Sequence, residues 1–339
     1  MNRNFAVLPF LCCAYPAASG SSVADPPVLS FKVSSLSPGQ ALPPAPNRLF
    51  SMAGSRLCFS SYVPSLMCSE DMGDHWKPMP AESISKLNVE SVAISPSDPS
   101  RVWAVAGVPK LGKMVILGSR DGGESWAVQL RVKGIMSALG DIWFSDSRYG
   151  WAVGSRTTEG GDVPLALWTQ NGGGTWHEAS IAMHDFIQPF MRVRFVSLLR
   201  GWAVGGNHII ETSDGGRTWA LQADTDPSAE LNGIEVVGPN DVWVTGGWNL
   251  LLHTRDGGRT WMRSIVDPSS QEYLWTVRFA TPNIGWVAGQ HGRVYATTDG
   301  GATWKRSELP VDEFVRDLLV VGHKLFILAD GPSVYSAEW

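Results

Sequence analysis

The chain has 339 residues, of which 44% are hydrophobic and 17% are charged, a composition typical of a globular protein. Its formal net charge is −5, which excludes nucleic-acid binding through general positive charge, so any basic site must be local. This length suits one large domain or two small ones.

The first residues predict an export signal. A weakly basic start is followed by the apolar run Phe5 to Ala14, and Ser22-Val23-Ala24 offers a small-residue cleavage site. The apolar run is too short to span a bilayer as a stable helix. We therefore predict a signal peptide at residues 1–24 and an exported mature domain at residues 25–339, located in the periplasm or outside the cell.

The four cysteines fall into two pairs. Cys12 and Cys13 lie in the apolar run, and the residues before Cys12 do not form a convincing lipid-attachment motif. Cys58 and Cys68 remain in the predicted mature chain. The sequence leaves open whether these two form a disulfide in an oxidising compartment or are two buried thiols.

An eight-residue motif recurs along the rest of the chain. Its clearest copy is Thr297 to Trp304, with the sequence TTDGGATW. The closing tryptophans recur every 42 to 50 residues, and a period of this size indicates a repeat architecture. The six copies end at Trp76, Trp126, Trp176, Trp219, Trp261 and Trp304.

Each copy has the chemistry of a tight turn between two strands. The hydroxyl residue and the aspartate can accept local N–H groups, the glycines permit a positive φ, and the tryptophan buries a large apolar surface. One copy has asparagine, which can hold a turn but cannot act as a carboxylate base. We interpret these positions as structural rather than catalytic. They are Asp71, Asp121, Asn171, Asp214, Asp256 and Asp299.

A short apolar strand with an aromatic residue recurs at the same period. Gly201-Trp202-Ala203-Val204-Gly205 is a clear example. Seven such strands occur against six complete octapeptides, so the chain is predicted to contain seven repeats, the last without its octapeptide. The seven aromatic residues are Phe50, Trp103, Trp151, Trp202, Trp243, Trp286 and Phe326.

The segment Tyr273 to Leu309 shows the plan of one repeat. It divides into the apolar stretches Leu274–Ala280, Ile284–Ala288, Arg293–Thr298 and Trp304–Leu309, separated by turn residues. Four antiparallel strands in roughly 40 residues form one propeller blade. We therefore predict an all-β fold, a single seven-bladed β-propeller of four-stranded antiparallel blades. The seventh blade lacks a fourth strand, which the N-terminal segment Pro27–Leu29 or its neighbours could supply to close the ring.

The octapeptide resembles the Asp-box, or bacterial neuraminidase repeat. With the aromatic strand in register, the resemblance covers nearly the whole chain and is to the photosystem II stability/assembly factor family. It implies a propeller without catalysis that binds a protein or peptide partner, including a membrane-protein segment, through an arginine patch. In a photosynthetic host it implies the thylakoid lumen. We also expect no cofactor, no nucleic acid and a monomer.

Arginines on the predicted first strands are the candidate for that patch. Arg194 and Arg278 occupy the same repeat position, and Arg192 and Arg316 share another, two residues earlier, when the repeats are aligned on the second-strand aromatic residue. Guanidinium groups that converge on one rim would suit an anionic peptide or a carboxylate ligand. The alternative is that these are solvated arginines at strand ends, some of them paired with acidic residues of the protein. The acidic residues available for such pairing are Asp141, Glu235 and Asp317.

A glycoside hydrolase of the sialidase or xyloglucanase type is the alternative function. Such enzymes need two facing carboxylates, which Asp141 and Glu235 could provide. Against it, the Arg-Ile-Pro motif of sialidases is absent, and Glu272 and Tyr273 point to opposite faces of a strand as sequence neighbours. The seven histidines are scattered without metal-ligand spacing, so no metal site is predicted.

Overall fold

The computed structural model describes residues 29–33, 35–36, 48–60, 66–79, 84–183, 188–330 and 334–339. The predicted signal peptide, with Cys12 and Cys13, lies outside the described residues. Strands and turns make up nearly all of the described part, and η1 (Gln290–Gly292) is a single 3₁₀ turn. Within those ranges, no helix has the length and apolar character needed to cross a bilayer.

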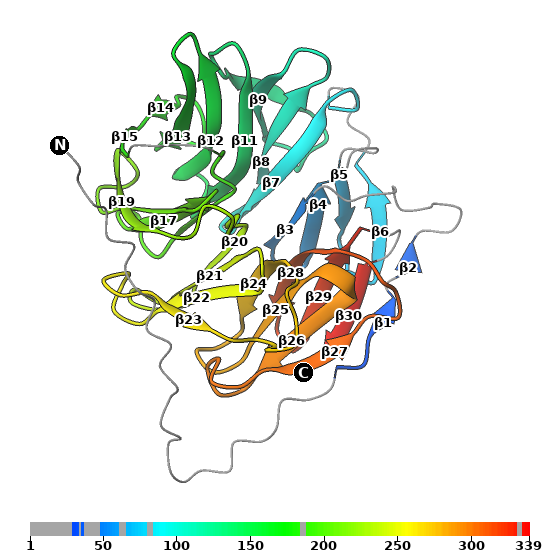
Figure 1. Cartoon of the computed structure of the whole chain (residues 1–339). Coiled ribbons are helices and arrows are strands. Elements are labelled where there is room, and N and C mark those ends of the chain that lie inside the picture. The colour runs from blue at the N-terminus through cyan, green and yellow to red at the C-terminus, as the bar shows by residue number, and fades with distance from the viewer. Residues whose placement is uncertain are drawn as a thin grey trace, which may run out of the picture.

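Seven separate β-sheets form the seven predicted blades (Figure 1). In six blades four strands that are consecutive in the chain pair antiparallel, and the seventh blade takes its fourth strand from the N-terminus. Blade 1 comprises β3 (Arg48–Ala53), β4 (Arg56–Ser60), β5 (Leu66–Ser69) and β6 (His75–Pro78). Blade 2 comprises β7 (Asn88–Ser95), β8 (Asp98–Val108), β9 (Lys113–Ser119) and β10 (Ala127–Arg131). Blade 3 comprises β11 (Ser137–Phe144), β12 (Gly150–Thr158), β13 (Gly161–Thr169) and β14 (His177–Glu178).

The remaining blades follow the same order. Blade 4 comprises β16 (Arg192–Phe195), β17 (Gly201–Gly205), β18 (His208–Thr212) and β19 (Thr218–Asp224). Blade 5 comprises β20 (Gly233–Val236), β21 (Val242–Gly246), β22 (Leu250–Thr254) and β23 (Met262–Ser264). Blade 6 comprises β24 (Leu274–Phe279), β25 (Gly285–Gly289), β26 (Arg293–Thr297) and β27 (Lys305–Glu308). Blade 7 comprises β28 (Val315–Val321), β29 (Lys324–Ala329), β30 (Val334–Glu338) and β1 (Lys32–Val33).

The first strand of every blade is its inner strand. Each inner strand contacts the inner strand of the next blade, and β28 of the last blade contacts β3 of the first, so the seven form a closed ring. In Figure 1 the strands β20, β24, β28 and β3 converge near the middle of the view. We call the face at which the inner strands begin the start face. The opposite face, which carries the octapeptide turns between the third and fourth strands, is the box face.

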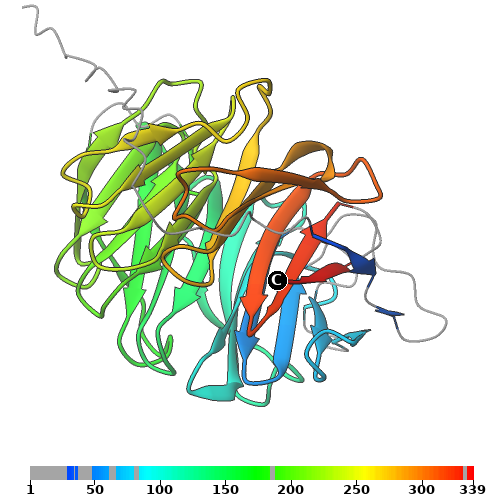
Figure 2. The same cartoon turned by 90° about the horizontal axis from the view of Figure 1, so that it is seen from below.

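The ring closes through the N-terminal strand. β1 pairs antiparallel with β30, with Lys32 opposite Ser336 and Val33 opposite Tyr335. Figure 2 shows the dark blue β1 beside the red β30. This strand lies just after the segment Pro27–Leu29 proposed from the sequence. Leu29 is buried and donates its N–H to Ser307 Oγ at 3.1 Å, which fixes the approach to β1.

The recurrent second-strand aromatic residue packs between neighbouring blades. In blade 1 this residue is Phe59 of β4, and the prediction of Phe50 is wrong, because Phe50 lies in the first strand, β3. Trp103 stacks on Phe144 of the next inner strand with ring centroids 3.5 Å apart, and Trp151 stacks on Phe195 at 3.8 Å. Both tryptophans are almost fully buried. Aromatic stacking of this kind adds to the burial of apolar area, so the repeat conserves the residue that joins one blade to the next.

Blades 1 and 4 each carry a fifth strand, which the sequence did not predict. β2 (Ser35–Leu36) pairs parallel with β6, and β15 (Ser180–Ala182) pairs parallel with β19. In both cases the extra strand covers the outer edge of a blade, where unpaired backbone groups would otherwise face solvent.

Candidate functional site

The six octapeptides form six equivalent turns on the box face. In each, the first hydroxyl oxygen accepts the N–H of the second glycine at 2.7 to 3.0 Å. The carboxylate or amide oxygen Oδ1 accepts the N–H of the residue before the tryptophan at 2.8 to 3.0 Å. Gly257 and Gly258 show why glycine recurs, since their φ values are +73° and +85°. In the first copy Met72 occupies such a position with a φ of +59°.

These hydrogen bonds keep the aspartates ionised. Burial raises the pKa of Asp256, but bonds from the hydroxyl and N–H of Thr260 and from Thr254 outweigh it and lower the pKa to about 2. The pKa of Asp71 is also about 2, because bonds from His75 and Ser69 outweigh the effect of burial. A carboxylate that accepts several N–H and O–H groups in its own turn is a structural acceptor and a poor proton donor.

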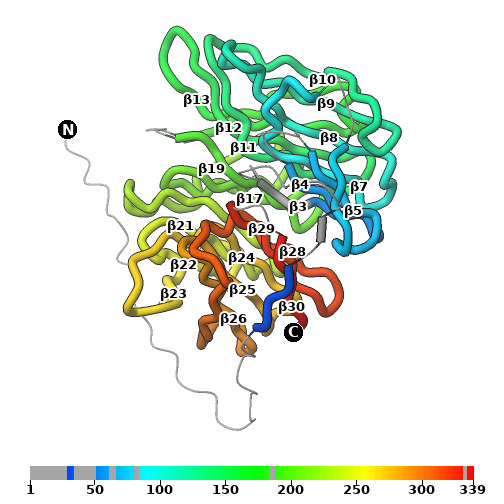
Figure 3. Tube along the Cα trace, turned by 90° about the vertical axis from the view of Figure 1, so that its right-hand side faces the viewer, coloured from blue at the N-terminus to red at the C-terminus, as the bar shows by residue number. Residues whose placement is uncertain are grey.

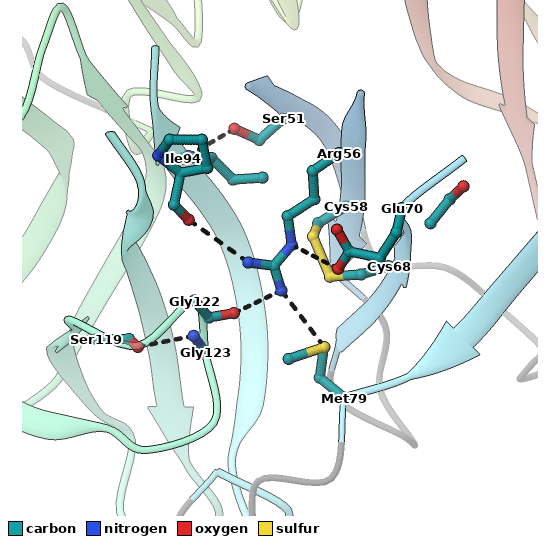
Figure 4. The surroundings of a disulfide bond; sticks show 12 residues. Ser51, Arg56, Cys58, Cys68, Glu70, Met79, Ile94, Ser119, Gly122 and Gly123 are labelled. Carbon is teal, nitrogen blue, oxygen red and sulfur yellow. Dashed lines mark hydrogen bonds and ion pairs between the residues drawn. A yellow bond between two sulfur atoms is a disulfide. The ribbon is translucent and has the colours of Figure 1, made fainter. Parts of the chain in front are cut away.

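The turns also join neighbouring blades. In five of the six copies, the carbonyl of the first glycine accepts a hydrogen bond from a side chain of the preceding blade. Figure 4 shows the case in which Arg56 of blade 1 donates to Gly122 of blade 2. The donor–acceptor pairs are Arg56–Gly122 at 2.5 Å, Trp103–Gly172 at 3.0 Å, Trp151–Gly215 at 2.8 Å, Arg200–Gly257 at 2.9 Å and Arg255–Gly300 at 3.0 Å.

Inner-strand charges form two ion-paired groups at the centre of the ring. In the first group, Arg194 Nη1 donates to Asp141 Oδ2 at 2.6 Å. The same carboxylate accepts the N–H of Val193 at 3.2 Å and, through Oδ1, the hydroxyl of Ser91 at 2.9 Å. Asp141 is 1% exposed and therefore links blades 2, 3 and 4 in a buried setting.

The second group lies across the ring. Arg278 Nη2 donates to Asp317 Oδ1 at 2.9 Å, and Arg278 Nη1 lies 3.6 Å from Glu235 Oε2. Thr276 donates its hydroxyl to Asp317 Oδ1 at 3.1 Å. These contacts of Arg278 join blades 5, 6 and 7, in the same way that the contacts of Asp141 join blades 2, 3 and 4.

The two groups influence each other electrostatically. Burial raises the pKa of Glu235, although Arg278 and Arg194 act in the opposite direction. Burial lowers the pKa of Arg278, but the charges of Asp317, Glu235 and Asp141 outweigh it and raise the pKa overall. The ion pairs offered in the predicted alternative are therefore present for Arg194 and Arg278, although these two side chains are largely buried rather than solvated.

The other two arginines do not occupy equivalent positions, and the predicted alignment of Arg192 with Arg316 is wrong. Arg192 pairs with Val204, two residues after the second-strand tryptophan. In β28 the corresponding residue is Asp317, because Phe326 pairs with Leu319, seven residues before it, whereas Trp202 pairs with Arg194, eight residues before it. Arg316 is an extra residue in a β-bulge between Val315 and Asp317. Sequence counting could not detect this shift.

The bulge places Arg316 at the start face in an aromatic setting. Its guanidinium group binds both oxygens of Asp330, at 2.5 and 2.7 Å, and lies over the rings of Phe314 and Trp275 at 4.5 and 5.4 Å. These two rings meet edge to face at 5.2 Å. The Arg316 side chain is 29% exposed, compared with 16% for Arg194 and 14% for Arg278. Arg192 is buried and donates to the carbonyl of Met191 at 2.8 Å.

Sequence reasoning missed Asp330, Phe314 and Trp275 as neighbours of Arg316. Phe314 is two residues before Arg316 in the sequence FVRD, so its proximity had a local signal. Asp330 follows the end of β29, and Trp275 comes from a neighbouring inner strand.

In the described ranges no group of three or more histidine, cysteine, aspartate or glutamate residues could hold a metal ion.

Cys58 and Cys68 form a disulfide, which decides the alternative that the sequence left open. They lie directly opposite each other in β4 and β5 and are fully buried. Arg56, two residues away, pairs with Glu70 at 3.1 Å and reaches the turn of blade 2 (Figure 4). The disulfide thus stiffens the blade that supplies this cross-blade contact.

The fold and its repeats define the class of protein: a seven-bladed β-propeller with one turn motif per blade in six of seven blades. The family model for photosynthesis system II assembly factor YCF48 matches residues 173–270. This match confirms the resemblance to the photosystem II assembly factor-like family. A comparison with curated protein sequences gives no match.

Several solved structures share the fold. The structure titled YCF48 bound to D1 peptide has a TM-score of 0.70 and 17% identity, covering 95% of this chain and 100% of that one. YCF48 from Cyanidioschyzon merolae has a TM-score of 0.65 and 19% identity, covering 88% of this chain and 98% of that one. The GH74 enzyme from Niastella koreensis has a TM-score of 0.66 and 15% identity, covering 90% of this chain and 53% of that one.

Proposed function

We propose that this protein is an exported, non-enzymatic assembly scaffold that binds a peptide segment of a protein partner on its start face. The observation that carries the proposal is the Arg316 cluster, in which a partly exposed guanidinium group lies over two aromatic rings. The family model and the propeller solved with a D1 peptide support a peptide as the ligand class. An arginine already oriented by a carboxylate is pre-organised to receive an anionic group of a peptide.

The four arginines predicted as a patch take different parts in this proposal. Arg316 and its aromatic neighbours contact the peptide. Arg194 and Arg278 hold the inner strands together through Asp141 and Asp317, so their effect on binding is indirect. Arg192 is buried at the start of β16 and stabilises the start face of blade 4.

Fluorescence anisotropy with a labelled D1 peptide tests the proposal. We expect wild type to bind and Arg316→Ala to bind about tenfold more weakly, as expected for loss of one hydrogen bond to a charged group. Arg148→Ala is the matched control, because Arg148 is an exposed arginine on the box face that stacks on Tyr149. Thermal melts check that each variant is folded. Absence of peptide binding by wild type, or equal binding by Arg316→Ala, would overturn the proposal.

Glycoside hydrolysis is the second candidate, and the raised pKa of Glu235 is the observation that favours it. Its potential partners Asp141 and Asp317 are each 1% exposed and accept several hydrogen bonds from the protein. Fluorogenic sialosides and β-glucosides test this candidate directly. Turnover that is lost in Glu235→Gln would replace the scaffold proposal with an enzyme.

The disulfide supports the exported location. Such bonds persist in oxidising compartments and are rare in the cytosol. Mass spectrometry of protein isolated with its thiols blocked should show Cys58 and Cys68 linked to each other. Two alkylated thiols in the native source would instead indicate a reducing compartment.

A further inference from the structure

A second surface on the start face has a different character from the Arg316 cluster. It contains three aliphatic or thioether side chains that are more than half exposed: Leu111 at 63%, Ile135 at 57% and Met136 at 56%. We call these three residues the apolar tip. Contiguous exposed apolar groups on a soluble protein mark an interaction surface more often than chance.

Backbone contacts hold the apolar tip together. Ser137 donates its N–H to the carbonyl of Gly112 at 2.9 Å, so the link between blades 2 and 3 lies against the β8–β9 turn. Ile135 donates to Thr157 at 2.8 Å, and Thr157 donates to Met136 at 3.0 Å. The Met136 side chain packs over Gly112, where an added Cβ would lie 3.2 Å from Met136 Cε. The tip is therefore one rigid surface built from two blades.

This surface projects from the start face. β12 and β13 each have nine residues, whereas β17 and β18 of the next blade each have five. Aligned on Trp151 and Trp202, the blade 3 hairpin is four residues longer at this end, which is about 13 Å. Figure 3 shows the green hairpin of β12 and β13 at the upper edge of the molecule. Thr157, which binds both Ile135 and Met136, lies in this extension.

Positive charge surrounds the apolar tip. Lys110, Arg131 and Lys133 are exposed, and within the described ranges none of them lies in an ion pair. Lys113 donates to the carbonyl of Gly134. The nearby carboxylates are Glu159 and Asp162, and Asp162 accepts the hydroxyl of Thr157 at 2.6 Å. Apart from Arg156, which is paired with Glu178, these are four cations against two carboxylates, an excess of positive charge opposite in sign to the net charge of −5 of the whole chain.

We propose that the apolar tip and its lysine rim dock on a lipid bilayer that contains anionic headgroups. A projecting aliphatic surface can enter the acyl boundary while lysines contact headgroups, and binding strength follows apolar area plus attraction to acidic lipid. Protein-binding hot spots are instead enriched in tryptophan, tyrosine and arginine in well-packed pockets, and the tip has no aromatic residue. Docking here turns the start face, with Arg316, toward the membrane.

Vesicle co-sedimentation of the purified chain tests this proposal. The probes are vesicles of phosphatidylcholine alone and vesicles with about one third phosphatidylglycerol. We expect wild type to bind only the acidic vesicles. The variant Lys110→Glu/Lys133→Glu should bind the acidic vesicles at least about 25-fold more weakly than wild type, because the loss of each lysine lowers the affinity about fivefold. Ile135→Asp/Met136→Asp should not bind.

Leu198→Asp/Leu199→Asp is the matched control. Leu198 and Leu199 are also adjacent and exposed, at 44% and 57%, but they lie on the box face beside the turn of Gly215. This variant should bind acidic vesicles as wild type does. Failure of wild type to bind acidic vesicles, or equal losses in the control and the tip variants, would overturn the proposal.

Peptide anisotropy with the same variants separates the two proposals. Ile135→Asp/Met136→Asp should bind the D1 peptide with wild-type affinity. Membrane docking can therefore fail while peptide binding is retained, and peptide binding can fail while membrane docking is retained. If wild type ignores vesicles and the tip variant loses the peptide, the tip is a protein-binding surface and the membrane proposal is wrong.

Discussion

The box face and the inner strands both depend on carboxylates that accept hydrogen bonds, but these carboxylates act over different distances. On the box face, Asp256 accepts groups from within its own eight-residue turn. On the inner strands, Asp141 accepts groups from residues about 50 positions away in either direction. Box carboxylates therefore shape a turn, whereas inner-strand carboxylates hold the ring together.

The largest expected effect is on the inner strands. Asp141→Ala should lower the free energy of unfolding by about 3–5 kcal/mol, because it leaves the largely buried guanidinium group of Arg194 without its carboxylate. Urea denaturation at neutral pH measures the change. Asp141→Leu/Arg194→Met removes both charges and should recover much of the loss. A loss below about 1 kcal/mol in Asp141→Ala would mean that the inner carboxylates do not hold the ring.

A smaller effect is expected on the box face. Asp256→Ala should cost about 1 kcal/mol at neutral pH through loss of local hydrogen bonds. Asp256→Asn should cost less, because Asn171 shows that an amide accepts the same N–H, from Thr175 at 2.8 Å. Urea denaturation of the two variants measures this difference, and equal costs would contradict the local role of the turn.

The same variants carry a pH prediction. The pKa of Asp256 is lowered to about 2 in the folded protein, below about 4 in an unfolded chain. The carboxylate therefore stabilises the fold above pH 4, and this contribution is lost as pH falls from about 4 to about 2. The free energy of unfolding of Asp256→Asn should fall less steeply than that of wild type in this pH range, as measured by urea denaturation at several pH values. Identical slopes for the two proteins would contradict the prediction.

The smallest effect is expected at Glu235. Burial raises its pKa in the folded protein, so ionisation begins to cost stability as pH rises above about 4.3, the value for an unfolded chain. The cost grows until the folded-state pKa is passed and then stays constant. Glu235→Gln should thus be as stable as wild type or more stable at neutral pH, within about 1 kcal/mol. Denaturation at neutral pH and below pH 4 checks that the difference vanishes in acid. Marked destabilisation at neutral pH would show that the Arg278 pair outweighs burial.

The same contrast explains what the sequence could predict. The turn of Asp256 and six of the seven aromatic second strands follow from local residue chemistry and are confirmed, and the strand bounds of blade 6 agree with the prediction to within one residue. In blade 1 the prediction was wrong, because Phe50 lies in the inner strand and Phe59 takes the second-strand position. The pairing of Arg194 with Asp141 could only be offered as one alternative, since it joins strands of different blades. The predicted position of Arg316 was wrong because the connection from β28 to β29 is one residue shorter than the one from β16 to β17, which changes the residue that faces each neighbour.

The apolar tip also depends on contacts between blades, which the sequence could not predict. Residues Thr157 to Pro164 lie in the β12–β13 hairpin, which extends beyond the hairpin of the next blade. That Ile135 and Met136 lie against this hairpin could not be read from the sequence, because it depends on how the link from blade 2 crosses it.

The closure of blade 7 by β1 has a consequence for the time course of folding. The pair β1–β30 joins segments near opposite ends of the described chain, so its contacts carry a greater loop entropy than those within a blade. Pairings of this kind form late, after blades made of local hairpins. Until then the outer edge of β30 and the backbone of β1 are open to strands of other molecules. Chaperone demand and domain-swapped dimers should therefore arise at this one seam. A circular permutant that joins β30 directly to β1 by a short loop should shorten the vulnerable interval.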